Sequence, residues 1–277
     1  MGLIELKVVL LQIPELKHAS VCMRDGGRVE TIIEHMRREE PNALQVISDF
    51  DMTLTRFAHN GTRCPTSYGE YTCTHTHSAL ILALYPWVQC VCYHAECCVC
   101  VCVCVCVCVC VCVCVREEYK SFFDVLRWNS VPLLIFSAGV GDILEEVITE
   151  HGVFHPNVRV FSNYMDFDQH GVVRAFKGDV IHTFNKREGA IQNTQQFVHD
   201  RSNVLLLGDS LGDLDMADGV QGLRNILRIG YLNDKVEERR EAYVRSYDIV
   251  LEKDETLDVP NAILNYITAE KRDHAPV

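Results

Sequence analysis

The stretch that decides the fold is ISDFDMTLT, residues 47–55. An apolar run leads directly into two carboxylates, Asp49 and Asp51, with Thr53 following them. Two carboxylates this close repel each other when both are ionised, so a cation or a proton has to relieve the repulsion. The stretch therefore predicts a buried strand that ends in a reactive pair of acids. A turn with solvated acids, or a helix N-cap, is the simpler alternative, because aspartate is common at such positions.

Similar apolar runs recur along the chain and predict a sheet. They cover residues 46–51, 132–137, 158–163, 204–209 and 248–251. Short runs without clean alternation are typical of strands buried on both faces of a parallel sheet. Helical patterns lie between them, at residues 119–126, 143–148 and 235–247. Alternating strands and helices predict a doubly wound, Rossmann-like α/β fold.

The second helical pattern has predicted boundaries at both ends. Asp142 is expected to be its N-cap, and Gly152 is a good C-terminal stop.

The polar residues that end the predicted strands are expected to share one crevice, since ligands of such sheets bind beyond the carboxyl ends of the strands. These residues are Asp49, Asp51, Ser137, Asp209 and Asp213. In such a crevice Asp49 is suited to remain ionised against a metal and to attack phosphorus. Asp51 is suited to carry the proton that the leaving oxygen needs.

Two further stretches offer groups for an anion. In LLIFSAGVGD, residues 133–142, Ser137, Ala138 and Gly139 follow an apolar run, where a hydroxyl and backbone N–H groups can hold phosphate oxygens. In FNKREGA, Lys186 brings one ammonium that can balance the charge of a phosphate and the aspartates. Taken singly, a plain turn and a solvated surface lysine are the simpler explanations.

The stretch LLLGDSLGDLDMADG, residues 205–219, supplies the remaining acids. Asp209 ends a strand and Asp213 follows one helical turn later. Mg²⁺ prefers about six oxygen ligands and keeps several waters. Asp49, Asp209 and the backbone carbonyl of Asp51 would supply the protein's share, and Asp213 could act directly or through water. An acidic loop with an N-cap explains one of these acids but not all of them.

Four such elements in this order resemble the haloacid dehalogenase superfamily of aspartate-based phosphohydrolases. Its signature is D-x-D-x-T, then a hydroxyl residue, a lysine and an acidic pair. The longer stretches LQVISDFDMTLTRFAHNGTRCPTSY, LIFSAGVGDILEEVI and LLLGDSLGDLDMADGV resemble the cytosolic pyrimidine and 7-methylguanosine-phosphate 5′-nucleotidases. SYDIVLEKDETLDV is more similar to the 7-methylguanosine-phosphate member. The resemblance covers about residues 21–68 and 116–267.

The resemblance implies Mg²⁺-dependent hydrolysis of nucleoside 5′-monophosphates through an aspartyl-phosphate, with 7-methylguanosine 5′-monophosphate preferred and CMP second. It implies Asp49 as nucleophile and Asp51 as general acid/base. Mg²⁺ would lie at Asp49, Asp51 and Asp209. Phosphate contacts would come from Ser137, Ala138 and Lys186, with Thr53 and Asp213 in support.

The chain departs from this family between Tyr68 and Arg116, where the family has a mostly helical cap with an acidic residue and aromatics that grip the base. Here residues 98–115 are nine Cys-Val pairs. A metal cluster and a membrane span are two functional interpretations, but zinc sites usually use two separated ligand pairs, and the period of 2 favours a strand over a helix.

A TGTGTG repeat also encodes alternating Cys and Val, and its complement encodes the Thr-His alternation at residues 74–77. We therefore interpret the segment as translated non-coding DNA, from a retained intron or a gene-model error. Trp87 and Glu96 lie in it, but their surroundings assign them no role.

The predicted domain organisation follows from this departure: an N-terminal extension at 1–27, the start of the core at 28–68, the aberrant segment at 69–115 and the rest of the core at 116–277. Without its cap, the chain could instead be a catalytically impaired or unselective form of the phosphatase.

Composition sets outer limits on the partners and the location of the chain. Its formal net charge of −12 over 277 residues argues against nucleic acid as the main partner. Cys22, Cys64 and Cys73 are scattered, as is usual for thiols of a reducing compartment, and the start of the chain carries no secretory pattern. We expect a cytoplasmic monomer that acts on a small nucleotide, without membrane attachment.

Overall fold

The computed structural model describes residues 8–67, 114–169, 173–182, 186, 198 and 200–269 of the chain. Most of the segment predicted to be aberrant, including Trp87, Glu96 and the Cys-Val pairs up to residue 113, lies outside the described residues.

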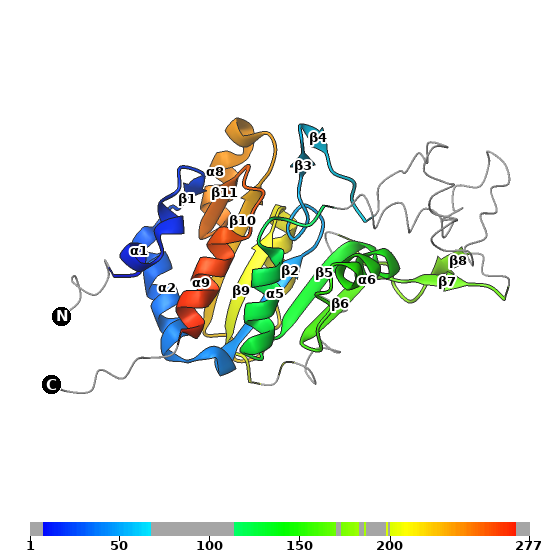
Figure 1. Ribbon diagram of the computed structural model, residues 1–277, viewed down its shortest axis with the longest axis horizontal. Coiled ribbons are helices and arrows are strands. Elements are labelled where there is room, and N and C mark those ends of the chain that lie inside the picture. Colours follow the sequence, from blue (N-terminus) through cyan, green and yellow to red (C-terminus); the bar gives the residue numbers. More distant parts are fainter. Residues whose placement is uncertain are drawn as a thin grey trace.

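The described chain is built on a seven-stranded sheet (Figure 1). In spatial order its strands are β1 (Val21–Cys22), β11 (Ile249–Glu252), β10 (Asn225–Leu232), β9 (Asn203–Gly208), β2 (Leu44–Asp49), β5 (Leu133–Val140) and β6 (Val158–Asn163). All neighbours are parallel except β1, which pairs antiparallel with β11. This confirms the predicted α/β class with a parallel sheet.

Helices cover both faces of the sheet. They are α1 (Val8–Gln12), α2 (Gly26–Arg38), α5 (Tyr119–Trp128), α6 (Gly141–Glu150), α8 (Val236–Ser246) and α9 (Asp258–Thr268). Among the described residues there are also three short 3-10 helices, η2 (Pro14–Lys17), η3 (Pro41–Ala43) and η4 (Leu211–Ala217). In Figure 1, α2, α9 and α5 lie side by side across one face.

The central strands are buried on both faces, which explains their unbroken apolar sequence. In β2, Val46 belongs to the hydrophobic cluster under α2, α5 and α9, whereas Ile47 belongs to the cluster under α8. In β9, Leu205 belongs to the first of these clusters and Leu206 to the second. Each face of the sheet therefore contributes to its own hydrophobic cluster.

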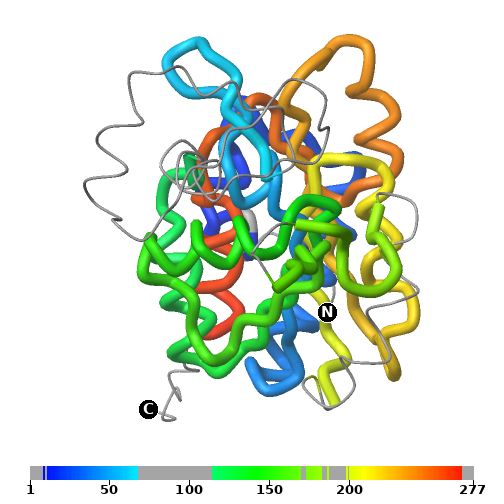
Figure 2. The backbone as a smooth tube through the Cα atoms, turned by 90° about the vertical axis from the view of Figure 1, so that its right-hand side faces the viewer, coloured from blue at the N-terminus to red at the C-terminus, as the bar shows by residue number. Residues whose placement is uncertain are grey.

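In the part of the chain that the structure describes, two small hairpins lie outside the sheet. β3 (Ala58–His59) pairs with β4 (Thr62–Arg63), and β7 (Met165–Phe167) pairs with β8 (Val173–Phe176). The β3–β4 hairpin, cyan in Figure 2, projects from the same end of the molecule in both views. It follows the carboxyl end of β2 and so lies on the side of the predicted site.

Several local expectations need correction. β10 lies between β9 and β11 although it is not among the predicted strands, and the part of the chain predicted as an N-terminal extension supplies β1. β5 continues to Val140, so the predicted turn at Ser137, Ala138 and Gly139 is the end of the strand itself.

Of the two boundaries predicted for helix α6, the N-cap is wrong and the C-terminal stop is confirmed. The N-cap of α6 is Val140, and the carboxylate of Asp142 instead accepts a hydrogen bond from the backbone N–H of Met165 at 2.8 Å. Gly152 does follow the helix, with a φ of 70° that suits glycine.

The last residues of the predicted aberrant segment pair with the chain that follows β2. Thr55 and Val115 form an antiparallel bridge, and the N–H of Arg56 donates to the carbonyl of Cys114 at 2.7 Å. The N–H of Arg116 donates to the carbonyl of Leu54 at 3.0 Å. Residues 114–116 thus lie against the chain that follows β2. Among the described helices, none has the length and apolar character needed to cross a membrane.

Candidate active site

Three acids meet at the carboxyl ends of two neighbouring strands. Asp49 is the last residue of β2, Asp209 directly follows β9, and Asp213 lies in η4. β2 and β9 pair in parallel, with Ser48 opposite Leu207, so their ends lie side by side. One carboxylate oxygen from each acid lies within 4.8 Å of the others. Residues more than 150 positions apart in sequence therefore form one acidic cluster.

Lys186 points into this cluster. Its Nζ donates to Oδ1 of Asp49 and to Oδ1 of Asp213, both at 2.6 Å. The lysine is buried, with 6% of its surface exposed. A lysine is rarely buried unless it is paired, and here two carboxylates pair with it. The alternative of a solvated surface lysine does not hold.

Asp213 also holds the backbone of the loop that carries Asp209. Its Oδ2 accepts hydrogen bonds from the N–H of Ser210 at 2.9 Å and from the N–H of Asp209 at 3.1 Å. A Cβ on Gly208 would lie 2.5 Å from the Cβ of Asp213, so only glycine fits there. Asp213 therefore caps the start of η4 and also belongs to the acidic cluster. In the sequence these two roles were alternatives.

Burial and charge both perturb the ionisation of the cluster. Burial raises the pKa of Asp49 to about 7 despite the opposing effect of Lys186, and it raises the pKa of Asp209 well above its ordinary value. Burial lowers the pKa of Lys186, but the charges of Asp49 and Asp213 outweigh this, so its pKa is raised.

The donor set fits a divalent cation. If Asp49, Asp209 and Asp213 are all ionised, one ammonium leaves two negative charges uncompensated. A hard divalent ion bound by carboxylate oxygens would balance them. The buried hydroxyl of Thr53 also has no hydrogen-bond partner among the described residues, which leaves a donor available next to the acids.

Asp51 lies in a separate, tightly bonded position. Its carboxylate accepts hydrogen bonds from the N–H of Ser67 at 2.7 Å and from Oγ of Ser67 at 2.6 Å. Burial raises the pKa of Asp51, and the bonds from Ser67 partly oppose that rise. Ser67 was not among the predicted site residues, because nothing in a lone serine 16 residues further on signals this contact.

The predicted phosphate residues Ser137 and Ala138 lie beside β2, since Asp49 is opposite Phe136 in the pairing of β2 with β5. Oγ of Ser137 accepts a hydrogen bond from the N–H of Gly139 at 3.0 Å, and the carbonyl of Ala138 accepts one from Asn163 at 2.9 Å. A Cβ on Gly139 would lie 1.7 Å from Oγ of Ser67, so this strand end packs directly against the partner of Asp51. Ser137 and Ala138 are therefore at the same edge of the sheet as the acids.

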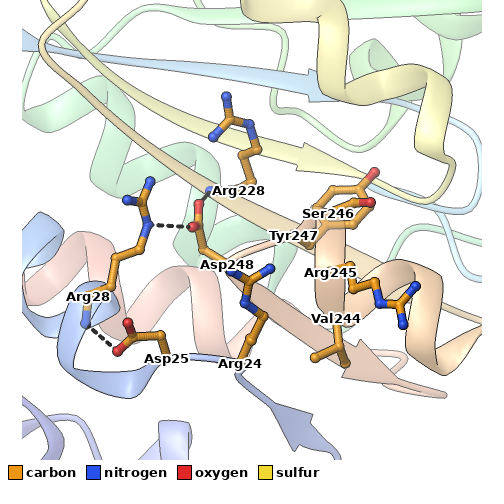
Figure 3. A pocket seen from close by; sticks show the side chains of 9 residues that line it. All are labelled: Arg24, Asp25, Arg28, Arg228, Val244, Arg245, Ser246, Tyr247 and Asp248. Atoms are coloured by element: carbon orange, nitrogen blue, oxygen red, sulfur yellow. Dashed lines mark hydrogen bonds and ion pairs between the residues drawn. The ribbon is translucent and has the colours of Figure 1, made fainter.

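A cavity of about 280 Å³ lies elsewhere, between the start of α2, the end of α8 and strands β10 and β11 (Figure 3). Four arginines line it: Arg24, Arg28, Arg228 and Arg245. The carboxylate of Asp248 accepts from Nε of Arg28 at 3.4 Å and from the N–H of Arg228 at 2.9 Å. Asp248 directly precedes β11, whose first residue Ile249 is level with Leu207 of β9 through Ile229 of β10. The cavity nevertheless shares no lining residue with the acidic cluster.

Comparison with known proteins identifies the family. The family profile described as pyrimidine 5′-nucleotidase (UMPH-1) matches residues 107–268. The human 7-methylguanosine phosphate-specific 5′-nucleotidase is 46% identical to this chain, over 94% of the chain and 96% of the relative. The chain belongs to the pyrimidine 5′-nucleotidase family. This confirms the resemblance predicted from the motifs.

Further 5′-nucleotidases are similar to this chain in sequence or in structure. The 7-methylguanosine phosphate-specific 5′-nucleotidase of Drosophila melanogaster is 32% identical, over 95% of this chain and 92% of its own. The crystal structure of cytosolic 5′-nucleotidase IIIB bound to cytidine matches with a TM-score of 0.76 and 31% identity, covering 93% of this chain and 96% of that chain. As a family member, the chain is a 5′-nucleotidase, with the α/β fold class expected for it.

Proposed function

We propose that this nucleotidase hydrolyses nucleoside 5′-monophosphates to a nucleoside and phosphate, with Asp49 as the nucleophile. 7-Methylguanosine 5′-monophosphate is the preferred substrate and CMP the second. The observation that carries the proposal is the cluster of Asp49, Asp209 and Asp213, in which the buried Lys186 pairs with Asp49 and Asp213. The names of the relatives, and the cytidine in the related crystal structure, support this choice of substrates.

In the first step a carboxylate oxygen of Asp49 attacks phosphorus, and the bond between phosphorus and the ribose 5′-oxygen breaks. Asp51 gives a proton to the departing oxygen, which leaves as the nucleoside hydroxyl. The raised pKa of Asp51 suits this role, because burial favours its protonated form. The phosphoryl group is then an acyl phosphate on Asp49.

In the second step water attacks that phosphorus, and Asp51 accepts the proton that the water loses. The bond between phosphorus and the Asp49 oxygen breaks, which releases inorganic phosphate and restores both acids. Because Ser67 holds Asp51 through two hydrogen bonds, the same carboxyl group remains in place for both transfers.

Binding of the phosphate falls to Lys186, Ser137 and the N–H groups at the end of β5, including that of Ala138. Lys186 already lies 2.6 Å from Asp49, so its charge is close to where the reacting phosphoryl group would be. A preorganised cation at this position stabilises the charge of the transition state.

We further propose Mg²⁺ as the cofactor, held by Asp49, the backbone carbonyl of Asp51 and Asp209, with Asp213 in direct or water-mediated support. When bound, it would neutralise charge on the phosphoryl oxygens and allow the negatively charged nucleophile and substrate to approach. We place the protein in the cytoplasm as a monomer, in line with the cytosolic name of its structural relative.

The deciding experiment measures phosphate release from 7-methylguanosine 5′-monophosphate and CMP in the presence of Mg²⁺. We expect Asp49→Asn to abolish release, because an amide does not replace the nucleophilic carboxylate. Asp248→Asn is the matched control, since its carboxylate binds Nε of Arg28 and the N–H of Arg228 and is not part of the acidic cluster, and it should keep wild-type turnover. Equal rates for wild type and Asp49→Asn would refute the proposal.

A second candidate function follows from the sequence of residues 69–115. If that segment replaces the part of the fold that recognises the base, the protein is a weak or unselective phosphatase. It would then hydrolyse small phosphate esters as well as nucleotides. Michaelis constants in the range of about 1 μM to 1 mM for nucleotides would argue against this alternative.

A further inference from the structure

The loop between the nucleophile and the β3–β4 hairpin has an unusual backbone at Met52. This residue has a φ of 63°, in the left-handed region that disfavours residues with a side chain. Its N–H donates to Oγ1 of Thr55 at 2.8 Å. Such a conformation persists when surrounding contacts fix it, and it is found most often at functional sites.

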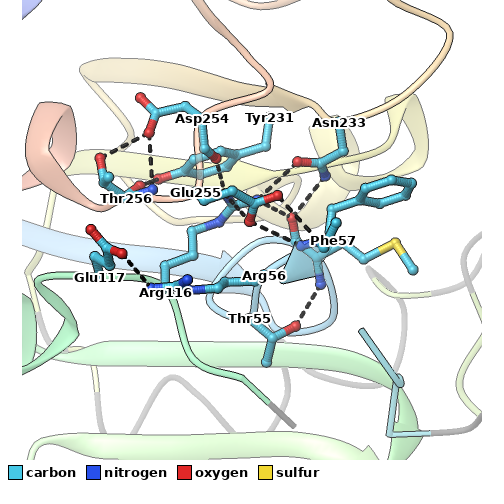
Figure 4. A network of polar contacts seen from close by, with 12 residues as sticks. Thr55, Arg56, Phe57, Arg116, Glu117, Tyr231, Asn233, Asp254, Glu255 and Thr256 are labelled. Atoms are coloured by element: carbon cyan, nitrogen blue, oxygen red, sulfur yellow. Dashed lines mark hydrogen bonds and ion pairs between the residues drawn. The ribbon is translucent and has the colours of Figure 1, made fainter. Parts of the chain in front are cut away.

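A single buried arginine fixes the other side of this loop (Figure 4). Nη2 of Arg116 donates to the carbonyl of Met52 at 2.6 Å, and Nε donates to the carbonyl of Thr53 at 2.7 Å. Asn233, which follows β10, donates to the same Met52 carbonyl at 2.9 Å and accepts from Nη2 of Arg116 at 3.0 Å. Two consecutive carbonyls of the loop are therefore held by one guanidinium.

The surroundings of Arg116 leave this guanidinium little freedom. The side chain is fully buried, and its guanidinium carbon lies 3.9 Å from the centre of the Tyr231 ring. Nη1 donates to the carbonyl of Asp254 and lies 3.4 Å from Oε2 of Glu255. A planar, permanently charged fork can satisfy this many acceptors in fixed directions, which the ammonium of lysine cannot do.

These contacts bear directly on the acids. The carbonyl of Asp51, the backbone oxygen proposed as a magnesium ligand, belongs to the same peptide unit as the N–H of Met52. Thr55 binds that N–H, and Arg116 binds the carbonyl at the other side of the same residue. The direction of the Asp51 carbonyl is thus set by contacts on both sides of Met52.

We propose that Arg116 is a positioning residue for the catalytic loop. It holds the left-handed turn at Met52, so that the backbone carbonyl of Asp51 and the carboxylates of Asp49 and Asp51 are correctly oriented for the metal and for phosphoryl transfer. This proposal rests on the proposed function, because it concerns the same metal and the same two acids. Arg116 itself does not contact the substrate.

The test compares Arg116→Lys and Asn233→Ala with wild type. We expect each to lower kcat, by on the order of 10²-fold for Arg116→Lys, because a displacement of about 1 Å near the reacting groups has that effect. The KM for the nucleotide should change much less, and the Mg²⁺ concentration needed for half-maximal activity should rise. Asn233→Ala removes one neutral donor and is the milder variant if Arg116→Lys folds poorly.

Arg201→Lys is the matched control. Arg201 also donates to backbone carbonyls, those of Pro41, Leu44 and Ser130, but at the amino end of β2. Its substitution should lower the melting temperature without changing kcat or the Mg²⁺ requirement. If Arg116→Lys and Asn233→Ala behave like Arg201→Lys, Arg116 is only a structural residue and the proposal is wrong.

Phosphate release and the change in melting temperature caused by Mg²⁺ distinguish a failure of this proposal from a failure of the proposed function. Should the wild-type protein release no phosphate from any nucleotide, the proposed function fails. The rise in melting temperature caused by Mg²⁺ then still tests the positioning of the loop. A smaller rise in Arg116→Lys and Asn233→Ala than in wild type and Arg201→Lys would support the proposal, and equal rises in all four would overturn it.

Discussion

The two ends of the parallel sheet use charged residues in different ways. At the carboxyl end, Asp49, Asp209 and Asp213 cluster around one lysine, and the acids outnumber the cation. At the amino end of β2, Arg201 donates hydrogen bonds to the backbone carbonyls of Pro41, Leu44 and Ser130.

This difference shows how charge can be arranged for stability or for chemistry. At the amino end the guanidinium of Arg201 has its acceptors within the protein, so the arrangement needs no ligand. At the carboxyl end the protein retains an uncompensated negative charge, which destabilises the cluster until a cation or a proton arrives. We expect that substitutions at the two ends will have different consequences for activity and similar ones for stability.

The largest effect is expected for Lys186→Met compared with Arg201→Met. Lys186→Met leaves the buried carboxylates of Asp49 and Asp213 without their cation, so turnover should fall by on the order of 10²- to 10³-fold, comparable to the loss of one preorganised oxyanion donor. Stability of the metal-free protein should fall by about 3 kcal/mol, as when one partner of a buried ion pair is removed. Denaturant titration and phosphate release measure the two effects. Arg201→Met should lower stability alone, and a comparable loss of turnover in it would remove the distinction between the two ends.

Mg²⁺ should stabilise the wild-type protein through the acidic cluster. At about 100 times its dissociation constant, a ligand that binds only the folded state adds about 2.7 kcal/mol to stability. For a chain of this size that corresponds to a rise in melting temperature of roughly 5 to 10 °C, which EDTA should reverse. Asp209→Asn should abolish most of the rise, whereas Asp248→Asn should retain it. An unchanged rise in Asp209→Asn would place the ion elsewhere.

The metal-free protein should lose stability as the pH rises. The pKa of Asp49 is raised by burial to about 7, so the folded state holds a proton that the unfolded state has already released. The corresponding stability is fully present below about pH 4, the ordinary value for aspartate, and is lost as the pH rises through about 7. Denaturant titrations at pH 5 and pH 8 measure this change. Saturating Mg²⁺ should remove it, because the ion replaces the proton, and a metal-free protein that is equally stable at both pH values would contradict the charge imbalance.

The smallest effect is expected for Ser67→Ala. The backbone N–H of Ser67 still binds Asp51, but the hydroxyl bond is lost, which should cost about 1 kcal/mol of stability and roughly tenfold in turnover. Because the bonds from Ser67 lower the pKa of Asp51, the alkaline limb of the pH–rate profile should move to higher pH. Ser162→Ala is the control, since its hydroxyl binds the carbonyl of Gly139 and not an acid. A profile that stays in place would argue against Asp51 as the proton donor.

The strands that deliver the acids could be predicted because burial on both faces gives an unbroken apolar run followed by a polar residue. The juxtaposition of Asp49 with Asp209 then followed from the geometry of parallel sheets. β10 was missed as a strand because its sequence, NILRIGYL, contains an arginine and a glycine within the run. Gly230 is needed there, since a Cβ would lie 2.5 Å from the ring of Tyr247.

Ser67 and Arg116 could not be predicted as parts of the site. Each acts through a contact between segments that lie far apart in sequence, and neither belongs to a short motif with a recognisable spacing. The capping error at Asp142 has a similar cause, because its carboxylate binds the N–H of Met165 across the sheet edge and not its own helix. Local sequence thus identifies groups that follow strands, but not long-range partners.

The bridge between Thr55 and Val115 has a consequence for changes in chain length. Because Val115 pairs with Thr55, the residues between them begin and end next to each other. Doubling the length of a flexible loop closed at such a point costs only about 0.6 kcal/mol. Changes in the length of the chain between Ser67 and Cys114 should therefore cost little stability, provided that Ser67 still binds Asp51.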